Sequence, residues 1–350
     1  MSIDALTVRR PDTRGPAIAL GVVLAGLLVL GRLTGLQDAA AAGTFVLIFT
    51  SLVVEALPFV LMGALVSAVI EVYVPPSWFG RVAGFPLPLQ LPAAALGGFA
   101  FPVCECGSVP VARRLIAKGM HPAAGLAFML ASPILNPIVL ASTWVAYSGR
   151  GVAAEMVLGR AGLGLILALT AGWAIGGERA GDLLRPRPGE DDHPAVAPTA
   201  PLASSPDHRS ASRLRSQARF GEFTGHLASD FFFMGRFVVL GGAIAALLQT
   251  AIPQSIVGSV AQTPVVGALA LMGLAFVLSL CSEADAFVAV SFVQFPLGSQ
   301  LAFLVFGPVV DAKLALLYGA TFRRRFVVRL LAVALPVTLA GSLWFEVIIR

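Results

Sequence analysis

The chain has 350 residues, of which 57% are hydrophobic and only 12% are charged, and its mean hydropathy is +0.87. An average soluble domain carries roughly 25% charged residues, so this composition excludes a soluble globular protein and indicates that lipid solvates most of the chain. The net charge of +5 does not predict a nucleic-acid partner, because the basic residues lie between apolar segments and form no continuous face.

Apolar segments of about 20 residues, the length that a helix needs to cross a membrane, recur along the chain. They are continuous and rich in Leu, Ala and Val, which favours helices over a barrel, whose strands would alternate in polarity over about ten residues. We therefore predict an all-α polytopic membrane protein with about eight or nine membrane segments. The segments cover residues 16–35, 44–74, 92–112, 121–147, 152–176, 227–252, 263–290, 299–320 and 326–349.

Four regions follow from this pattern. Residues 1–43 hold a polar, arginine-bearing tail and a first membrane helix, which is long enough to span and which we interpret as uncleaved. Residues 177–226 hold several prolines among Ser, Asp and Arg without apolar periodicity, and this composition predicts a disordered cytoplasmic linker. The linker separates a first repeat at 44–176 from a second repeat at 227–350.

The two halves resemble each other at a nearly constant offset. Phe59–Gly63 matches Phe237–Gly241, and Cys104 matches Cys281. The match continues in the next segments, where Leu126, Ala127, Phe128, Pro133 and Asn136 correspond to Leu301, Ala302, Phe303, Pro308 and Asp311. Internal duplication in a helical membrane protein is typical of transporters, whose substrate binds near the bilayer midplane on interrupted helices.

The positive charges help to choose between parallel and inverted repeats. If every apolar segment crosses, the arginine-rich linker lies on the opposite side from the basic N-terminus, against the positive-inside rule. If the cysteine-bearing segments 92–112 and 263–295 instead enter and return as re-entrant hairpins, the N-terminus, the linker and Arg323–Arg325 all lie in the cytoplasm. We favour this second arrangement, which makes the repeats inverted. The alternative, in which all segments span, stays open.

Two short motifs, Cys104–Pro110 and Cys281–Asp285, hold all three cysteines of the chain together with three carboxylates. Both motifs lie within strongly apolar segments. A carboxylate in hydrocarbon costs roughly 2.5 to 3.5 kcal/mol on insertion scales, so such groups need a cation, a proton or a water-filled pathway beside them. We therefore expect the functional site of the protein to lie at these two motifs.

Helix-breaking residues surround the motifs. Pro102, Gly107 and Pro110 are expected to interrupt the helix at the first motif, and Ser132–Pro137 and Gly307–Asp311 are expected to interrupt the segments that follow each motif. Unwound backbone at membrane depth is tolerated only where it is buried in protein or lines a cavity. We therefore expect four helix breaks, two from each half, to meet.

Thiolates bind soft or borderline ions such as Zn(II), Cu(I) and trivalent arsenic, and zinc also accepts carboxylates. A single buried cysteine is as often a small apolar residue, but three thiols in repeat-related motifs with acids favour a binding site. The predicted metal ligands are Cys104, Cys106, Cys281 and Glu283. The predicted substrate-binding set adds Glu105, Ser108, Ser132, Asn136, Ser282, Asp285 and Asp311.

Four stretches together resemble a known family. They are the Cys-x-Cys-Gly-x-x-Pro stretch at 104–110, Ala-Ser-Pro-x-x-Asn-Pro at 131–137, Cys-Ser-x-x-Asp-Ala-Phe at 281–287, and Gly-Pro-x-x-Asp at 307–311. By these residues the chain is similar to the ArsP/YraQ-type predicted permeases of bacterial inner membranes, which include exporters of trivalent organoarsenicals. The resemblance covers both halves and implies a fold of two helical repeats that moves a soft solute.

The residue between the first two cysteines departs from the arsenical-type members of this family, which tend to have a small or polar residue there. This chain has Glu105, and Glu283 adds a second acid. It therefore looks more like the subgroup with Cys-Glu-Cys and Cys-Ser-Glu-Ala-Asp, which the resemblance links to metal-ion homeostasis, zinc in particular. A neutral arsenous species needs no such anions, whereas a divalent cation does.

We predict a secondary permease that exports a zinc-like cation or a trivalent arsenical across the bacterial cytoplasmic membrane. We expect no enzymatic activity and no permanently bound cofactor. The expected partners are the lipid bilayer, the transported ion, and either a second copy of the chain or an accessory subunit. Two alternatives stay open: a membrane thiol redox enzyme that uses Cys104 and Cys106, and a non-transporting assembly subunit.

Overall fold

The computed structural model describes residues 40–75, 84–100, 103–177, 179–186, 208–251 and 263–349. Within these ranges the secondary structure is helical, apart from an isolated antiparallel bridge between Leu184 and Phe322. The helices are α2 (Ala40–Tyr73), α4 (Leu87–Ala100), α5 (Glu105–Ala117), α6 (Pro122–Leu135), α7 (Pro137–Ser148), α8 (Ala153–Ile175), α9 (Ala180–Leu183), α10 (His208–Ala251), α12 (Pro264–Leu278), α13 (Asp285–Ala289), α14 (Leu297–Phe306), α15 (Ala312–Thr321) and α16 (Arg324–Ile349). The predicted all-α class is confirmed.

Five stretches of helix in the described residues are long and apolar enough to cross a membrane: Ala42–Tyr73, Pro122–Ser148, Ala153–Ile175, Arg219–Thr250 and Arg324–Ile349. Three shorter apolar helices, α4, α12 and α14, accompany them. Large apolar side chains such as Leu47, Leu158 and Trp344 are exposed on the outside, as expected of a surface that lipid covers. The predicted segment 16–35 lies outside the described residues, so the total of eight or nine segments stays a prediction.

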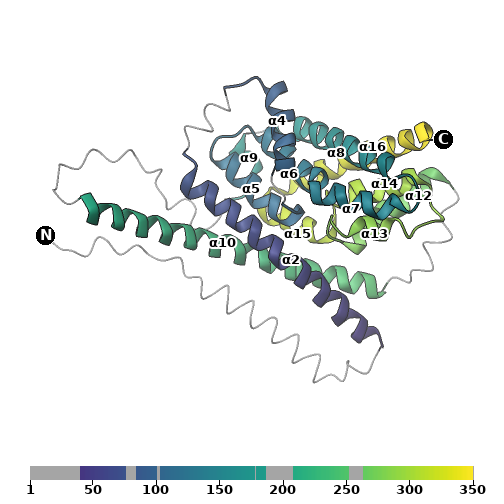
Figure 1. The fold of residues 1–350 in the computed structure, drawn as a ribbon, viewed down its shortest axis with the longest axis horizontal. Coiled ribbons are helices and arrows are strands. Elements are labelled where there is room, and N and C mark those ends of the chain that lie inside the picture. Colours follow the sequence, from purple (N-terminus) through teal and green to yellow (C-terminus); the bar gives the residue numbers. More distant parts are fainter. Residues whose placement is uncertain are drawn as a thin grey trace.

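The two longest helices, α2 and α10, pack along each other. In Figure 1 they cross one side of the helical bundle and run in opposite directions. They are joined at a buried hydrogen bond, in which the Ser67 hydroxyl donates to Oδ2 of Asp230 at 2.7 Å. The remaining helices lie together on one side of this pair (Figure 1).

The predicted linker at 177–226 contains helix at both ends of the range, and its disorder stays a prediction. The short helix α9 lies in this range, and α10 begins at His208. The last linker proline is Pro206, so the chain that follows is free to form helix. This helix is also held by α2, because the rings of Tyr73 and Phe223 lie 6.3 Å apart. The residues 187–207 lie outside the described part of the chain.

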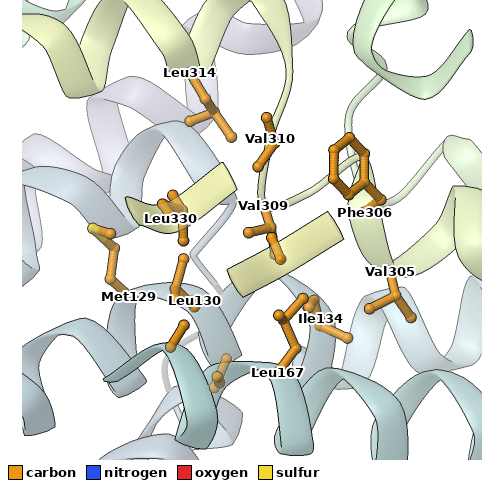
Figure 2. Close-up of a cluster of buried hydrophobic side chains, with 14 of the residues drawn as sticks. Met129, Leu130, Ile134, Leu167, Val305, Phe306, Val309, Val310, Leu314 and Leu330 are labelled. Carbon is orange, nitrogen blue, oxygen red and sulfur yellow. The ribbon is translucent and has the colours of Figure 1, made fainter. Parts of the chain in front are cut away.

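The apolar core lies between the two halves of the chain. Figure 2 shows buried side chains from α6 and α8 meeting those from α14, α15, α16 and the turn before α15. They include Met129, Leu130, Ile134 and Leu167 from the first half, and Val305, Phe306, Val309, Leu314 and Leu330 from the second. Because lipid tails are as apolar as leucine, these side chains stabilise the pairing of the halves through close contact, not through removal from water.

Four apolar segments within the described ranges are interrupted. One helix ends and the next begins between α4 and α5, between α6 and α7, between α12 and α13, and between α14 and α15. The predicted positions are partly wrong, because Gly107 and Pro110 lie inside α5 and Pro133 lies inside α6. The helix starts instead at Glu105, after the N-cap residue Cys104. The interruptions therefore place the first cysteine motif at the start of a helix.

A close approach of α10 to α15 gives a testable prediction. A Cβ added at Gly241 would lie 2.7 Å from the Cα of Lys313, whereas one added at Gly235 of the same helix would meet nothing within 4 Å. We expect Gly241→Ala to lower the thermal unfolding midpoint of the solubilised protein, since overpacking costs about 1–3 kcal/mol. Gly235→Ala is the matched control and should be neutral or stabilising, because alanine is favoured over glycine in a helix by roughly 1 kcal/mol. Equal midpoints for the two variants would contradict the prediction.

Candidate functional site

The first cysteine motif lies at the N-terminal end of α5. Cys104 is the N-cap residue in an extended conformation, and Glu105 and Cys106 occupy the first helical positions. All three side chains are buried, and both thiols are free. The thiol of Cys104 lies next to that of Cys106. Because the N-terminus of a helix carries partial positive charge, this position favours an anionic side chain.

The second cysteine motif forms the turn between α12 and α13. α12 ends where Ser279 adopts a left-handed conformation, with φ of 47°. The Ser279 hydroxyl accepts a hydrogen bond from the backbone N–H of Ala312 at 3.1 Å and donates one to the carbonyl of Phe276 at 3.0 Å. Cys281 is buried as a free thiol, and both carboxylate oxygens of Glu283 are buried with no hydrogen-bond partner among the residues that the structure describes.

The two motifs are in direct contact. The Ser282 hydroxyl donates to Oε2 of Glu105 at 2.7 Å, although the residues are 177 positions apart in the sequence. Cys281 is an electrostatic neighbour of both Glu105 and Cys106, and Cys104 is a neighbour of Cys281. The structure therefore brings the two motifs together, from opposite halves of the chain.

A buried lysine lies beside two acids at this contact. Nζ of Lys313 lies 3.7 Å from Oε1 of Glu105 and 3.7 Å from Oδ2 of Asp311. All three side chains are almost fully buried, with exposures of 3%, 1% and 1%. Asp311 also caps α15, because its Oδ1 accepts from the backbone N–H of Leu314 at 2.6 Å. The sequence places Asp311 and Lys313 two residues apart, and the cap position is what lets their side chains meet.

Asp285 has a partner that the sequence patterns did not reveal. Arg160 of α8 is fully buried and donates to both carboxylate oxygens of Asp285, at 2.9 and 2.7 Å. It also donates to Oγ1 of Thr143 at 2.8 Å and to the carbonyl of Ser282 at 3.2 Å. A signal was present in the sequence, because an arginine within an apolar stretch of 23 residues is itself an intramembrane charge that needs a partner.

The remaining predicted polar residues lie on the neighbouring helices. Ser108 of α5 donates to the carbonyls of Glu105 and Met129, at 3.1 and 3.0 Å, which ties α5 to α6. Asn136 caps α7 through its Oδ1. Its Nδ2 and the hydroxyl of Ser132 are buried, and within the described ranges neither has a hydrogen-bond partner. α7 in turn contacts α13, the helix that begins at Asp285.

These contacts do not form a closed metal site. Within the described ranges, no group of three or more His, Cys, Asp or Glu side chains is placed to hold a metal ion. Cys104, Cys106 and Cys281 are neighbours, but Glu105, the acid between the first two, is already held by Ser282 and Lys313. The assignment of Cys104, Cys106, Cys281 and Glu283 as ligands therefore stays a prediction.

A second polar cluster holds the other end of α5. Arg114 lies 3.4 Å from Oε2 of Glu71 on α2 and 3.4 Å from Oδ2 of Asp230 on α10. Lys118 caps the end of α2 by donating to the carbonyl of Ile70 at 2.8 Å. The helix that carries the first cysteine motif is thus fixed at one end to α2 and α10 and at the other to the second motif.

Comparison with known proteins identifies relatives across most of the chain. A family model described as "ArsP_1: Predicted permease" matches residues 41–347. The chain is 39% identical over 298 residues to the "UPF0718 protein YcgR" of Bacillus subtilis, covering 85% of this chain and 95% of that protein. It is 32% identical over 291 residues to a "Putative two-component membrane permease complex subunit" of Streptococcus mutans, covering 81% and 88%. No solved structure matches.

Proposed function

Because the chain belongs to the ArsP_1 family of predicted permeases, we propose that it is a secondary transporter that moves a thiophilic metal or metalloid ion across the bacterial cytoplasmic membrane. The observation that carries the proposal is the direct contact between the two cysteine motifs, which groups three free thiols with buried acids between the two halves. Thiols of this kind bind soft ions, and intramembrane acids mark ion pathways.

The buried charges favour a cation as the cargo. The acids Glu105, Asp285 and Asp311 face two basic side chains, Arg160 and Lys313. Glu283 adds a further buried acid, whose carboxylate has no hydrogen-bond partner among the described residues. The excess of acids over bases is smaller than the acids alone suggested, but it still favours a zinc-like cation over a neutral solute. A trivalent arsenical is the second candidate, because three neighbouring thiols suit arsenic(III).

An inverted repeat is consistent with this assignment. The repeat pairs α2 with α10, and these helices run antiparallel beside each other (Figure 1). α4 and α12, at 14 and 15 residues, are too short to span about 30 Å of hydrocarbon, as a re-entrant segment requires. In this arrangement the repeats at 44–176 and 227–350 would rock against each other around the cysteine motifs, which is the usual route to alternating access.

Each predicted residue then has a role. The thiols of Cys104, Cys106 and Cys281 ligate the cargo transiently. The acids Glu105, Glu283, Asp285 and Asp311 supply the compensating charge. The unpartnered Ser132 hydroxyl and Asn136 amide complete the polar surroundings, and Ser108 and Ser282 hold α5 against its neighbours. The Streptococcus mutans relative is described as a subunit of a two-component complex, which supports an accessory subunit for this chain. A thiol redox enzyme or a passive assembly factor would be equally compatible with such a subunit.

The test is flux in vesicles from cells that express the chain with Cys104→Ser, Cys281→Ser or Glu283→Gln. We expect each variant to lose most of the flux of zinc, arsenite or methylarsenite, whichever ion the wild type moves. Thr170→Ala is the control, since Thr170 is exposed on α8 and its hydroxyl donates to the carbonyls of Ile166 and Leu167 in its own helix. Unchanged flux of all three ions in the cysteine variants would sink the proposal, and mixed disulfides trapped on Cys104 or Cys106 would favour redox chemistry.

A further inference from the structure

Two carboxylate oxygens that face Lys313 lack hydrogen bonds in the described part of the chain. They are Oε1 of Glu105 and Oδ2 of Asp311, each buried and without a hydrogen-bond partner in the described part of the chain. The other oxygen of each group is satisfied, by the Ser282 hydroxyl and by the Leu314 backbone N–H. The two side chains are therefore fixed in place, and each keeps one free lone-pair face.

Both free oxygens face the same cation. Nζ of Lys313 lies 3.7 Å from each of them, within the range of an ion pair but beyond that of a hydrogen bond. An ammonium that belonged permanently to this site would be expected at about 2.7–2.9 Å, the length of a charge-assisted hydrogen bond. The lysine thus neutralises the two acids without satisfying either oxygen.

The same ammonium also faces the thiols. The electrostatic neighbours of Lys313 are Asp311, Glu105, Cys106 and Cys281. The electrostatic surroundings of this ammonium therefore include two carboxylate oxygens at 3.7 Å and thiols from both motifs. This is a mixed sulfur and oxygen donor set of the kind that zinc accepts.

We infer that Lys313 is a tethered counter-cation, whose ammonium competes with the transported cation for Oε1 of Glu105 and Oδ2 of Asp311. The inference rests on the proposed function and deepens it, because it assigns the carboxylate part of the cargo site and names the group that holds it in the absence of cargo. A tethered competitor keeps the buried acids neutralised when no cargo is bound. It also lowers the apparent affinity for the cargo, because the cargo can bind only while the ammonium is out of the site. A lower affinity favours release of the cargo.

The test measures stabilisation of the solubilised full-length protein by Zn²⁺, as the thermal unfolding midpoint against Zn²⁺ concentration. Lys313→Gln should lower the midpoint without Zn²⁺, because two buried acids lose their cation. It should also raise the apparent Zn²⁺ affinity by about tenfold, because the competitor is gone. Lys313→Arg keeps a cation at the site and should bind Zn²⁺ no more tightly than the wild type. Lys118→Gln, at the far end of α5, is the control for lysine removal and should leave the affinity unchanged.

The possible outcomes separate the inference about Lys313 from the proposed transport function. If Lys313→Gln folds only when Zn²⁺ is present during extraction, the ion has replaced the ammonium and the inference holds. If Zn²⁺ stabilises the wild type through the thiols but stabilises Lys313→Gln equally or less, the inference is overturned and the proposed function survives. If Zn²⁺ stabilises no protein in the series, both are overturned for zinc, and the same titration with methylarsenite then tests the proposed function alone.

Discussion

Arg160→Gln is expected to lower the free energy of unfolding by about 3–5 kcal/mol, the typical cost of breaking a buried ion pair by removing one partner. The variant removes a fully buried guanidinium that donates to both oxygens of Asp285, and the carboxylate is left uncompensated. The thermal unfolding midpoint of the solubilised protein measures the loss. Arg324→Gln, at the exposed start of α16, is the matched control and should unfold like the wild type.

A double variant separates charge compensation from transport. Arg160→Met with Asp285→Leu removes both charges and leaves apolar groups in their place, which is often neutral for stability. We expect it to recover most of the unfolding midpoint lost by Arg160→Gln, but to show little transport, because the start of α13 is no longer fixed to α8. If Arg160→Gln unfolds at the wild-type temperature, the buried ion pair does not contribute the predicted free energy of unfolding.

Asp311→Ala and Asp311→Asn should differ in stability, because the two carboxylate oxygens of Asp311 have separate roles. Its Oδ1 caps α15 by accepting from Leu314, and its Oδ2 faces Lys313. Alanine loses both, and loss of an N-cap alone costs about 0.5–2 kcal/mol. Asparagine caps a helix as well as aspartate does, so Asp311→Asn should fold and lose only the charge. We expect its flux to fall by about 10- to 100-fold, the usual effect of changing a group that supports a metal site.

Parallel measurements of unfolding and of vesicle flux check this separation. The alanine variant should lose both, and the asparagine variant only flux. Asn136→Asp makes the reciprocal change at the cap of α7, where the side-chain Oδ1 accepts from Ile138, and shows whether an added acid at the other repeat disturbs folding. Wild-type flux in Asp311→Asn would show that the carboxylate charge has no part in transport.

The helix positions could be predicted well wherever they depend on local properties. The apolar segment 326–349 corresponds to α16 (Arg324–Ile349), and 152–176 corresponds to α8 (Ala153–Ile175), because a spanning helix shows in its own composition. The beginning of α10 could not be predicted in this way. Residues 208–226 are mostly polar, and the ring contact that holds this part of the helix, between Phe223 and Tyr73 of α2, joins residues that are distant in the sequence.

The site could be predicted in part for a similar reason. Acids inside apolar stretches are costly, so Glu105, Asp285 and Asp311 were identifiable without a structure. Their partners were not, because Ser282 meets Glu105 across 177 residues and Arg160 meets Asp285 across 125. Basic residues in a membrane protein usually mark the cytoplasmic side, so the positive charges alone did not identify Arg160 as a partner of a buried acid. Its position inside α8, flanked by apolar residues, distinguishes it from arginines at helix ends.

Ser279 links two helix ends in a way that bears on motion. A serine with φ of 47° costs roughly 1–2 kcal/mol relative to a right-handed conformation, and here its hydroxyl accepts from the N–H of Ala312 at the first turn of α15. A hydrogen bond therefore joins the end of α12 to the start of α15. A tilt of α12 that kept this bond would move the capping Asp311 and change the distance from its carboxylate to Glu105 on the other half, so the movement of one helix would alter the cargo site.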